Sequence, residues 1–272
     1  MSKDTQSNWN EERARNWHLF MPPARPSKGE MAHYERVVLS EAKSASNRWA
    51  LLGSTPEIRS LASKYQRELL CIDKNAYVFE ALRSMVESPY SEIFICSDWL
   101  NVQVPRPVDV VFADGSINML PLSKHEELLK KIYDILNPQG LTLLRVHIVG
   151  PPKFSSPQEV FKWYRKSKIN EPVFSATRTH LDMLWIDPET LKLNFSEYHK
   201  KIQQLYDSKF ITVEEFDAYN RLLQFNRIDL YYTKREFFEH SALNYFQIEG
   251  LSYGNDYSGN MNHPLYFLSR KN

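Results

Sequence analysis

The sequence predicts an α/β fold built around a largely parallel sheet, and three observations support this. Between residues 48 and 148, five short apolar segments alternate with segments of helical character. Strands separated by helices of this length imply parallel pairing through right-handed crossovers. The run VDVVFA (108–113) is apolar almost throughout, which suits a strand covered on both faces. Several of these segments end in an acidic residue, so polar side chains gather at one edge of the predicted sheet.

The first half of the chain supplies five strands and three helices. The predicted strands are 48–53, 68–73, 92–97, 108–114 and 141–148, and the predicted helices are 55–66, 75–87 and 122–136. Ser123 is expected to be the N-cap of the third helix, with Glu126 completing a capping box. The run Asn-Pro-Gln-Gly at 137–140 is expected to stop that helix before the fifth strand.

After residue 150 the pattern changes. Residues 151–232 carry helical signals, two capping boxes that begin at Ser156 and Thr212, and many aromatic side chains. Thr233 is expected to cap one more helix, and two closing strands follow at 245–251 and 264–270. We therefore divide the chain into a leader or cap (1–47), a Rossmann-like core (48–150), a helical insertion between the fifth and sixth strands (151–232) and a segment that completes the sheet (233–272).

Composition narrows the classes of partner. The net charge is +1 and the pI is about 7.8, so no global field favours nucleic acid or an anionic membrane. The basic and aromatic run at 162–168 is interpreted as a solvated helix face. No apolar run approaches 18 residues and the N-terminus is polar, which predicts a cytoplasmic protein without a membrane partner. Cys71 and Cys96 both lie in apolar runs and are expected to be buried thiols, and no metal site is expected.

The run WALLGSTPEIRSLASKYQRELLCID (49–73) predicts a nucleotide-binding crevice. An apolar strand ends at Gly53, a helix follows, and the next strand ends in Asp73 some 20 residues later. A tight turn lets backbone approach a ligand, and a carboxylate at that spacing accepts hydrogen bonds from a ribose diol. Gly53 is the only glycine between Gly29 and Gly115, so the dinucleotide pattern G-x-G-x-x-G is absent. A ligand with a ribose and no pyrophosphate fits better, and S-adenosylmethionine is such a ligand.

With these residues, the chain resembles the class I S-adenosylmethionine-dependent methyltransferases, whose seven-stranded sheet ends in an antiparallel strand. The resemblance is close over residues 49–148 and looser from Thr233 onward. It places the family's glycine turn at Gly53-Ser54-Thr55, which departs from the usual GxGxG. It also implies that Asp73 binds the ribose, that Asp98 reads adenine with Trp99 beside the ring, and that Asp114 lies near the sulfonium. The cofactor-binding residues expected from this comparison are Gly53, Ser54, Thr55, Glu57, Asp73, Lys74, Asp98, Trp99, Asp114 and Gly115.

The sequence also contains candidate residues for binding the methyl acceptor. A leader containing Arg25-Pro26-Ser27 resembles one found on some bacterial methyltransferases, where it would pack over cofactor or substrate. Arg25, Tyr34 and Arg178 are candidates for orienting an acceptor. A general base is needed only where the acceptor must lose a proton, and histidine is the usual choice. The candidates are His147, which ends the fifth predicted strand, and His180 in a predicted lid helix.

The sequence therefore favours a methyltransferase that uses S-adenosyl-L-methionine and acts on an oxygen or nitrogen of a small molecule or modified peptide under a helical lid. Two other classes stay open. One is an NAD(P)-dependent oxidoreductase, which the single glycine of the turn disfavours. The other is a non-catalytic binding or interaction module with the same fold, which the altered turn keeps open. The apolar surface of the aromatic-rich helices would also suit a homodimer.

Overall fold

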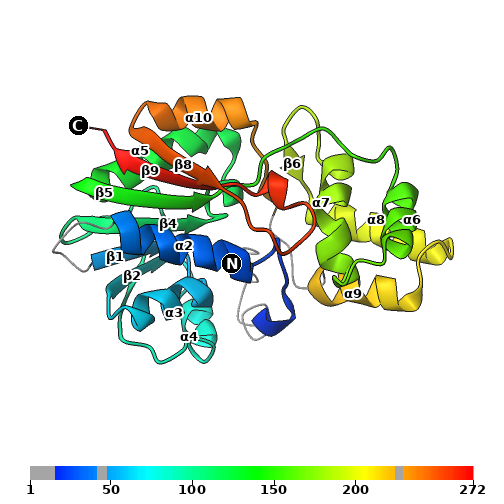
Figure 1. Ribbon diagram of the computed structural model, residues 1–272, viewed down its shortest axis with the longest axis horizontal. Helices are drawn as coiled ribbons and strands as arrows, with labels where there is room; N and C mark the ends of the chain where they lie inside the picture. Colours follow the sequence, from blue (N-terminus) through cyan, green and yellow to red (C-terminus); the bar gives the residue numbers. More distant parts are fainter. Residues whose placement is uncertain (1–15, 42–47, 224–228, 272) are drawn as a thin grey trace, which may run out of the picture.

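A seven-stranded sheet lies at the centre of the structure (Figure 1). The computed structural model describes residues 16–41, 48–223 and 229–271. The strands are β1 (Arg48–Leu52), β2 (Glu68–Asp73), β3 (Ser91–Cys96), β4 (Val108–Asp114), β5 (Leu136–Arg145), β8 (Phe246–Ser252) and β9 (Leu265–Arg270). Their order is β3-β2-β1-β4-β5-β9-β8. All neighbouring pairs are parallel except those of β9, which runs antiparallel to both β5 and β8. The prediction of a seven-stranded, mostly parallel sheet with an antiparallel last strand is confirmed.

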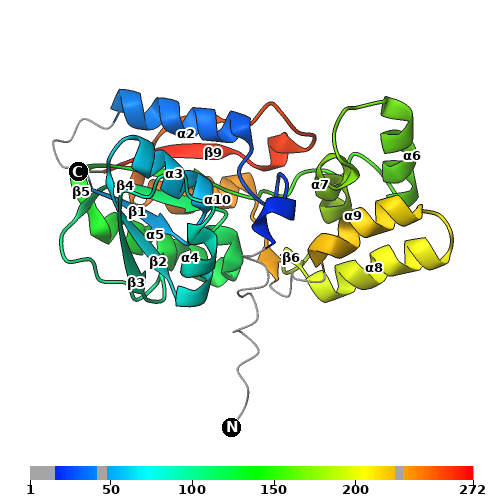
Figure 2. The same cartoon turned by 90° about the horizontal axis from the view of Figure 1, so that it is seen from below.

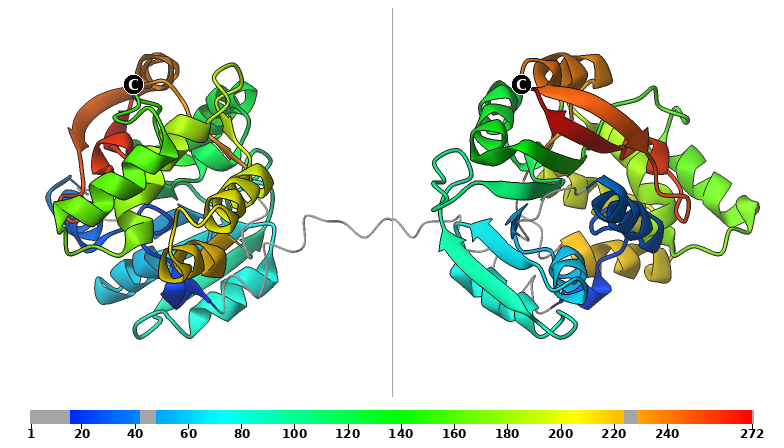
Figure 3. Two further views of the ribbon diagram at one scale, coloured as in Figure 1. Left: turned by 90° about the vertical axis from the view of Figure 1, so that its right-hand side faces the viewer. Right: turned by 60° about the vertical axis from the view of Figure 1, so that its left-hand side comes forward.

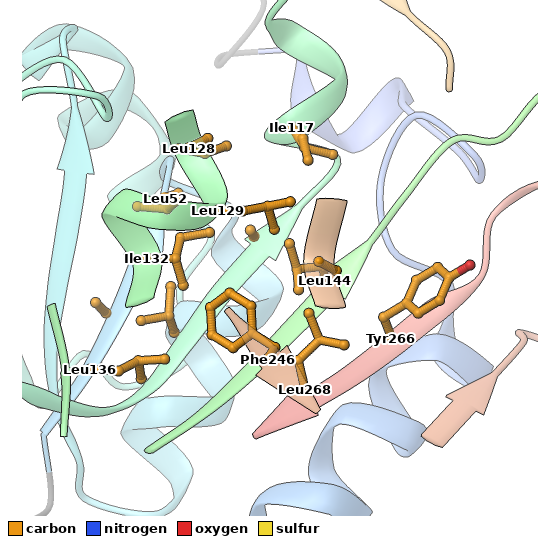
Figure 4. Close-up of a cluster of buried hydrophobic side chains, with 14 of the residues drawn as sticks. Leu52, Ile117, Leu128, Leu129, Ile132, Leu136, Leu144, Phe246, Tyr266 and Leu268 are labelled. Atoms are coloured by element: carbon orange, nitrogen blue, oxygen red, sulfur yellow. The ribbon is translucent and has the colours of Figure 1, made fainter. Parts of the chain in front are cut away.

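Helices cover both faces of this sheet (Figure 1). On one face lie α2 (Lys28–Glu41), α3 (Pro56–Lys64) and part of α4 (Ala76–Arg83), and on the other lie α5 (His125–Ile135) and α10 (Arg235–Leu243). Because side chains alternate along a strand, Val110 and Phe112 pack under α2 and α3, whereas Val111 and Ala113 pack under α5 and α10. Figure 4 shows the second of these two cores. The nearly continuous apolar runs of the sequence follow from this double coverage.

The chain between β5 and α10 forms a separate group of helices beside the sheet (Figures 2 and 3). They are α6 (Pro157–Ser167), α7 (Val173–Trp185), α8 (Phe195–Asp207) and α9 (Val213–Leu223), with the short paired strands β6 (Lys192–Leu193) and β7 (Leu230–Tyr231). Most of their aromatic side chains pack in one cluster among themselves. Trp17 and Phe20 of the N-terminal segment and Val78 and Leu82 of α4 belong to the same cluster. These aromatic residues therefore act mainly as a core that fixes the helical insertion against the sheet.

Two expectations about helix starts are wrong. Residues Leu122–Lys124 form a 3-10 turn, α5 begins at His125, and Ser123 caps nothing, because the chain enters the helix through that turn. Lys234 is the N-cap of α10, and the Thr233 hydroxyl instead donates to the Lys234 carbonyl. The box at Thr212 forms, since its hydroxyl accepts from the Glu215 N–H and its own N–H donates to the Glu215 carboxylate. At Ser156 only the cap forms, because the Glu159 carboxylate accepts from the Ser155 N–H instead of the Ser156 N–H.

The fifth strand differs from its expected range. It starts at Leu136, directly after α5, so the run at 137–140 lies within the strand and does not form a loop before it. A register shift between Val108 and Val110 absorbs this run, and Asn137 Nδ2 donates to Asp109 Oδ1 at 2.7 Å. The strand ends at Arg145, and His147 therefore lies in the segment beyond it.

The N-terminal segment contributes a 3-10 turn, η2 (Trp17–Leu19), and the helix α2. Residues 1–15 and 42–47 of the predicted leader lie outside the described residues. Within the described residues, no helix combines the length and the hydropathy needed to cross a bilayer. Cys71 is buried as expected, but Cys96 is exposed because the edge strand β3 has no further strand beside it.

Candidate functional site

A cavity of about 690 Å³ opens where the parallel strands β1, β2, β4 and β5 end. This position includes the switch point between β1 and β4, where the chain order of the strands reverses and where ligands of open α/β sheets bind. Its volume is in the range of small-molecule sites. The sheet, the N-terminal segment and the helical insertion each supply part of the wall. Eight of the ten expected cofactor-binding residues line it: Gly53, Ser54, Thr55, Asp73, Lys74, Trp99, Asp114 and Gly115.

The glycine turn after β1 forms one end of the cavity. Gly53 has a φ of +119°, a conformation that disfavours any residue with a side chain. Apart from its two neighbours in the chain, no described residue has an atom within 4 Å of the position that a Cβ would occupy there. A ligand can therefore approach the backbone closely at this point. The turn leads into α3, which has Pro56 in its first turn and no side-chain cap at Thr55.

Asp73, the last residue of β2, lines the same end of the cavity. Its Oδ1 accepts a hydrogen bond from the Asn75 backbone at 3.1 Å, and burial raises the pKa of its carboxyl group. Asn75 caps α4, with its side chain accepting from the Tyr77 and Val78 backbone. Asp73 is therefore not needed as the helix cap. Trp99 lies beside it, and its indole Nε1 donates to the Ile72 carbonyl at 2.7 Å, which fixes the ring at the end of β2.

Asp98 and Glu57 lie outside the lining of this cavity. Asp98 accepts from the Leu100 backbone at 2.8 Å and pairs with Lys74, so its carboxylate belongs to the turn after β3. Glu57 accepts from Trp17 Nε1 at 3.2 Å and pairs with Arg25. These contacts hold the N-terminal segment over the glycine turn, and Trp17, Pro23 and Ala24 of that segment line the cavity. Arg25 itself lies outside the lining.

Asp114, at the end of β4, is fully engaged by protein groups. Arg145 of β5 donates to both of its oxygens, from Nε at 2.7 Å and from Nη2 at 3.0 Å. The Tyr34 hydroxyl donates to Oδ1 at 3.1 Å. Arg145 Nη1 bonds to the Pro23 carbonyl at 2.9 Å and lies 3.4 Å from Glu30 of α2. Tyr34 is buried and joins α2 to the sheet, so it is placed behind the cavity wall and not within it.

His147 faces the cavity from the segment after β5. The Asn118 side chain holds its backbone, accepting from the His147 N–H at 2.8 Å and donating to its carbonyl at 2.9 Å. A Cβ at Gly115 would lie 3.4 Å from His147 Nε2, so the glycine leaves space in front of this nitrogen. The buried ring of His263 packs edge-on at 4.6 Å. Burial, and then the nearby His263, Arg145 and Arg178, lower the pKa of His147 well below its usual range.

The helical insertion contributes Arg178, Phe195 and Leu230 to the wall. His180 is not part of it. Its ring packs edge-on against Phe154 and Trp163 at 5.1 Å from each, on the side of α7 that faces α6. Burial lowers the pKa of His180 to about 4. Of the two candidate histidines, only His147 is brought to the site.

Several lining residues were not foreseen from the sequence. They are Trp17, Pro23, Ala24, Leu52, Asn75, Ala76, Tyr77, Leu82, Cys96, Ser116, Met119, Arg145, Phe195 and Leu230. One carried a readable signal: Arg145 is a lone charge at the end of the buried apolar strand LTLLR. A buried charge in that place requires a partner of opposite charge, and Asp114 at the end of the neighbouring strand is such a partner.

No family model matches the chain, and no curated protein matches it either. Solved structures with the same fold do exist. A Rhodobacter sphaeroides protein, provisionally described as a Zn-dependent alcohol dehydrogenase, is 16% identical over 100% of both chains, with a TM-score of 0.59. An S-adenosylmethionine-dependent methyltransferase from Clostridium acetobutylicum is 9% identical over 96% of this chain and 98% of its own, with a TM-score of 0.56.

A third structure contains a ligand. The N-methyltransferase NodS from Bradyrhizobium japonicum, in complex with S-adenosyl-L-homocysteine, is 8% identical over 96% of this chain and 99% of its own, with a TM-score of 0.51. Identities this low show the fold alone. The chain has the strand order and the layers of the class I methyltransferase fold. In the described residues, no three His, Cys, Asp or Glu side chains gather in a way that would hold a metal ion.

Proposed function

We propose that this protein is a methyltransferase that transfers the methyl group of S-adenosyl-L-methionine to an oxygen or nitrogen of a small molecule or modified peptide. The observation that carries the proposal is the cavity at the strand ends of a methyltransferase-type sheet, with the Gly53 turn, Asp73 and Trp99 together at one end. Solved structures of this fold include a methyltransferase with S-adenosyl-L-homocysteine bound.

The residues of this end fit the nucleoside part of the cofactor. Among the described residues, no side chain bonds to the Asp73 carboxylate, which leaves it able to accept from a ribose diol. Trp99 offers a ring face of fixed orientation, and Lys74 already pairs with Asp98. The carboxyl and amino groups of the cofactor's methionine part would lie toward the Gly53 turn and Asp114. In this proposal residues 48–150 and 233–272 form the cofactor-binding core, while the described parts of 1–47 and 151–232 cover it.

Methyl transfer is an in-line displacement, so this chain has two tasks. It must hold an acceptor nucleophile behind the methyl group, and it must exclude water. The bond from carbon to sulfur breaks as the bond to the acceptor forms, and sulfur keeps the electron pair. Where the acceptor is an alcohol or an ammonium group, a proton must also leave. His147 is the candidate to accept it, because it lines the cavity and its Nε2 lies beside Gly115, and the lowered pKa of the ring makes it a weak base.

The test is calorimetric binding of S-adenosyl-L-homocysteine and S-adenosyl-L-methionine to the full chain. The wild type should bind both. Asp73→Ala should bind at least about tenfold more weakly, because hydrogen bonds to a charged group contribute roughly 1.5–3 kcal/mol. Asp134→Ala, which removes an exposed acid on α5, is the matched control and should bind as the wild type does.

Failure of the wild type to bind either compound would reject the proposal. Titration with NAD(H) and NADP(H) addresses the oxidoreductase alternative, which requires tight binding of one of them. The non-catalytic alternative predicts weak cofactor binding or none.

A further inference from the structure

Arg178, one of the residues expected to orient an acceptor, is a buried charge in the cavity wall. It lies on α7, in the helical insertion, and its side chain is 5% exposed. Its guanidinium lies over three aromatic rings, those of Phe174, Phe195 and Tyr198, with centroids at 5.5, 4.8 and 5.0 Å. Burying a charge is costly unless it is paired, and an apolar side chain would close this wall without that cost.

The pairing of this guanidinium is incomplete. Arg178 Nε donates to Asp182 Oδ1, while the other oxygen of Asp182 accepts from the Tyr232 hydroxyl at 2.6 Å. Asp182 is therefore shared, and it does not take the two-bond arrangement common for arginine and carboxylate. Among the described residues, Nη1 and Nη2 have no hydrogen-bond partner, yet they are not enclosed, since Arg178 lines the cavity. A buried group that lines the cavity thus keeps two donors that no described residue uses.

We propose that Arg178 binds the carboxylate of the methyl acceptor, and that the acceptor is a small carboxylic acid with an apolar body. This inference rests on the proposed function, because only a methyltransferase has a methyl acceptor. The binding of an anion at Arg178 does not depend on that function. A carboxylate accepts both free donors in the planar geometry that guanidinium offers. The bound carboxylate would be the group that positions the acceptor, and a different oxygen or nitrogen would receive the methyl group.

Charge favours a carboxylate over a phosphate. Among the described residues, three cationic side chains line the cavity: Lys74, Arg145 and Arg178. All three nitrogens of Arg145 are engaged by Asp114, Glu30 and backbone carbonyls, and Lys74 pairs with Asp98 at the nucleoside end. Among the described residues, Arg178 alone of these three keeps free donors, and its charge is already paired with Asp182. A carboxylate adds one negative charge beside this pair, whereas a phosphate dianion adds two, and burial penalises the larger charge more.

The other residues of this part of the cavity indicate that the rest of the acceptor is apolar. Phe195 and Leu230 of the insertion, Met119 after β4, and Trp17 of the N-terminal segment are apolar surfaces of the same cavity. The charge of Arg178 also lowers the pKa of His147, after the larger effects of burial, His263 and Arg145, so the two side chains act on the same space. An acceptor held at Arg178 therefore has its apolar body between the lid and the sheet, on the His147 side of the cavity.

The experiment compares three probes that share a ring: benzoate, its neutral isostere benzamide, and phenyl phosphate. Each is titrated by calorimetry into the full chain, with and without saturating S-adenosyl-L-homocysteine. Benzoate should bind at least about tenfold more tightly than benzamide, because a charge-assisted bond contributes roughly 1.5–3 kcal/mol. Phenyl phosphate should bind no more tightly than benzoate.

The variants remove the donors without leaving a lone buried charge. Arg178→Gln combined with Asp182→Asn removes both partners of the pair, and the preference for benzoate over benzamide should disappear. Arg178→Lys keeps the positive charge and loses the two parallel N–H donors of the guanidinium, so the preference for benzoate over benzamide should shrink several-fold. The control is Arg165→Gln with Glu215→Gln, an ion pair of the same helical group that lies away from the cavity, and it should leave the preference unchanged.

Each result of these titrations either supports or overturns the assignment of a carboxylate site to Arg178. Equal binding of benzoate and benzamide by the wild type overturns the proposal, whether or not the double variant folds. Retention of the benzoate preference in a folded double variant also overturns it. Tighter binding of phenyl phosphate that depends on Arg178 replaces the carboxylate by a phosphate. Benzoate binding that depends on Arg178, in a protein that does not bind S-adenosyl-L-homocysteine, rejects the proposed function and leaves the anion site standing.

Discussion

His147 illustrates how a single residue gains its properties from its surroundings. It lies two residues beyond the end of β5, where Asn118 fixes its backbone through two hydrogen bonds. Its Nδ1 is buried without a partner among the described residues, while Nε2 faces the cavity. Burial and three nearby groups, His263, Arg145 and Arg178, all disfavour the charged ring. The imidazole is therefore held neutral, and the same groups make its protonation unfavourable.

This makes a prediction about pH. The folded protein holds His147 with its pKa well below 6.5, so fewer protons bind there than in the unfolded chain. The stability contributed by the neutral ring is fully present above pH 6.5 and is lost as the pH falls below that value. Histidine-selective NMR, assigned by the signal that disappears in His147→Gln, should show a neutral ring throughout titration from pH 8 to 5.5. A midpoint at or above 6.5 would contradict the prediction, and the urea-unfolded chain supplies the ordinary titration curve.

At the scale of elements, the N-terminal segment is part of the site. Three of its residues line the cavity, and two contacts with Glu57 hold it against α3. Glu57 was expected to contact cofactor, since acids in the first turn of a helix at a glycine turn are close to the ligand. Its carboxylate is instead turned toward Trp17 and Arg25, and burial raises its pKa. The structure thus supports a positioning role for Glu57.

Glu57→Gln should loosen this segment. We expect faster amide hydrogen exchange over residues 16–27 and about threefold weaker binding of S-adenosyl-L-homocysteine, since a partly exposed ion pair contributes up to about 1 kcal/mol. Glu214→Gln, which changes an exposed acid in the first turn of α9, is the matched control. Unchanged exchange over 16–27 in Glu57→Gln would show that other contacts, such as Arg145 to the Pro23 carbonyl, suffice.

For the whole molecule, one buried group of charges joins parts that are distant in sequence. Arg145 of β5 contacts Asp114 of β4 and Glu30 of α2, and Glu30 accepts from the Tyr257 hydroxyl at 2.7 Å in the segment before β9. Arg145 and the two acids are each less than 5% exposed at their side chains. Burial raises the pKa of Glu30 although Arg145 acts against it. The arrangement ties the covering helix α2 to the floor of the cavity.

Arg145→Met should therefore be among the most destabilising single changes. It leaves Asp114 buried without its cation, and breaking a buried pair in this way costs roughly 3–5 kcal/mol. Urea denaturation measures the loss, and absence of a cooperative transition would be its extreme form. Lys130→Met removes an exposed pair with Asp134 and should change the unfolding free energy by less than about 0.5 kcal/mol. Similar values for the two variants would show that the buried group contributes little.

Most of the sheet could be predicted from the sequence. The ranges of β2 and β4 were predicted residue for residue, because an apolar strand bounded by polar residues and ended by an acid is a local pattern. The starts of α5 and α10 were mispredicted, since Ser123 and Thr233 had cap-forming chemistry but the preceding turns set another geometry. A residue type that favours the N-cap position therefore does not fix where a helix begins, because the backbone conformation before the helix must also suit the cap.

The site was predictable where it follows the strand ends. Gly53, Asp73 and Asp114 lie at one edge because parallel strands all end there. Asp98 was expected from the family resemblance and His180 from its place in a predicted lid helix. Both lie outside the cavity lining, since a turn bond and aromatic packing fix their side chains. Their destinations depend on neighbours that are far away in sequence.

The sequence by itself determined the fold class, the order of its elements and the end of the sheet at which Asp73 and Asp114 lie, because strand periodicity and glycine turns are local properties. Only the tertiary structure decided which charges are free. Asp114 is engaged by Arg145, and Glu57 by Arg25, whereas Arg178 keeps two donors unused. The reason is physical: a hydrogen bond between side chains depends on angstrom-scale positions in space, and residues that meet there, such as Asp114 and Arg145, are 31 positions apart in the chain.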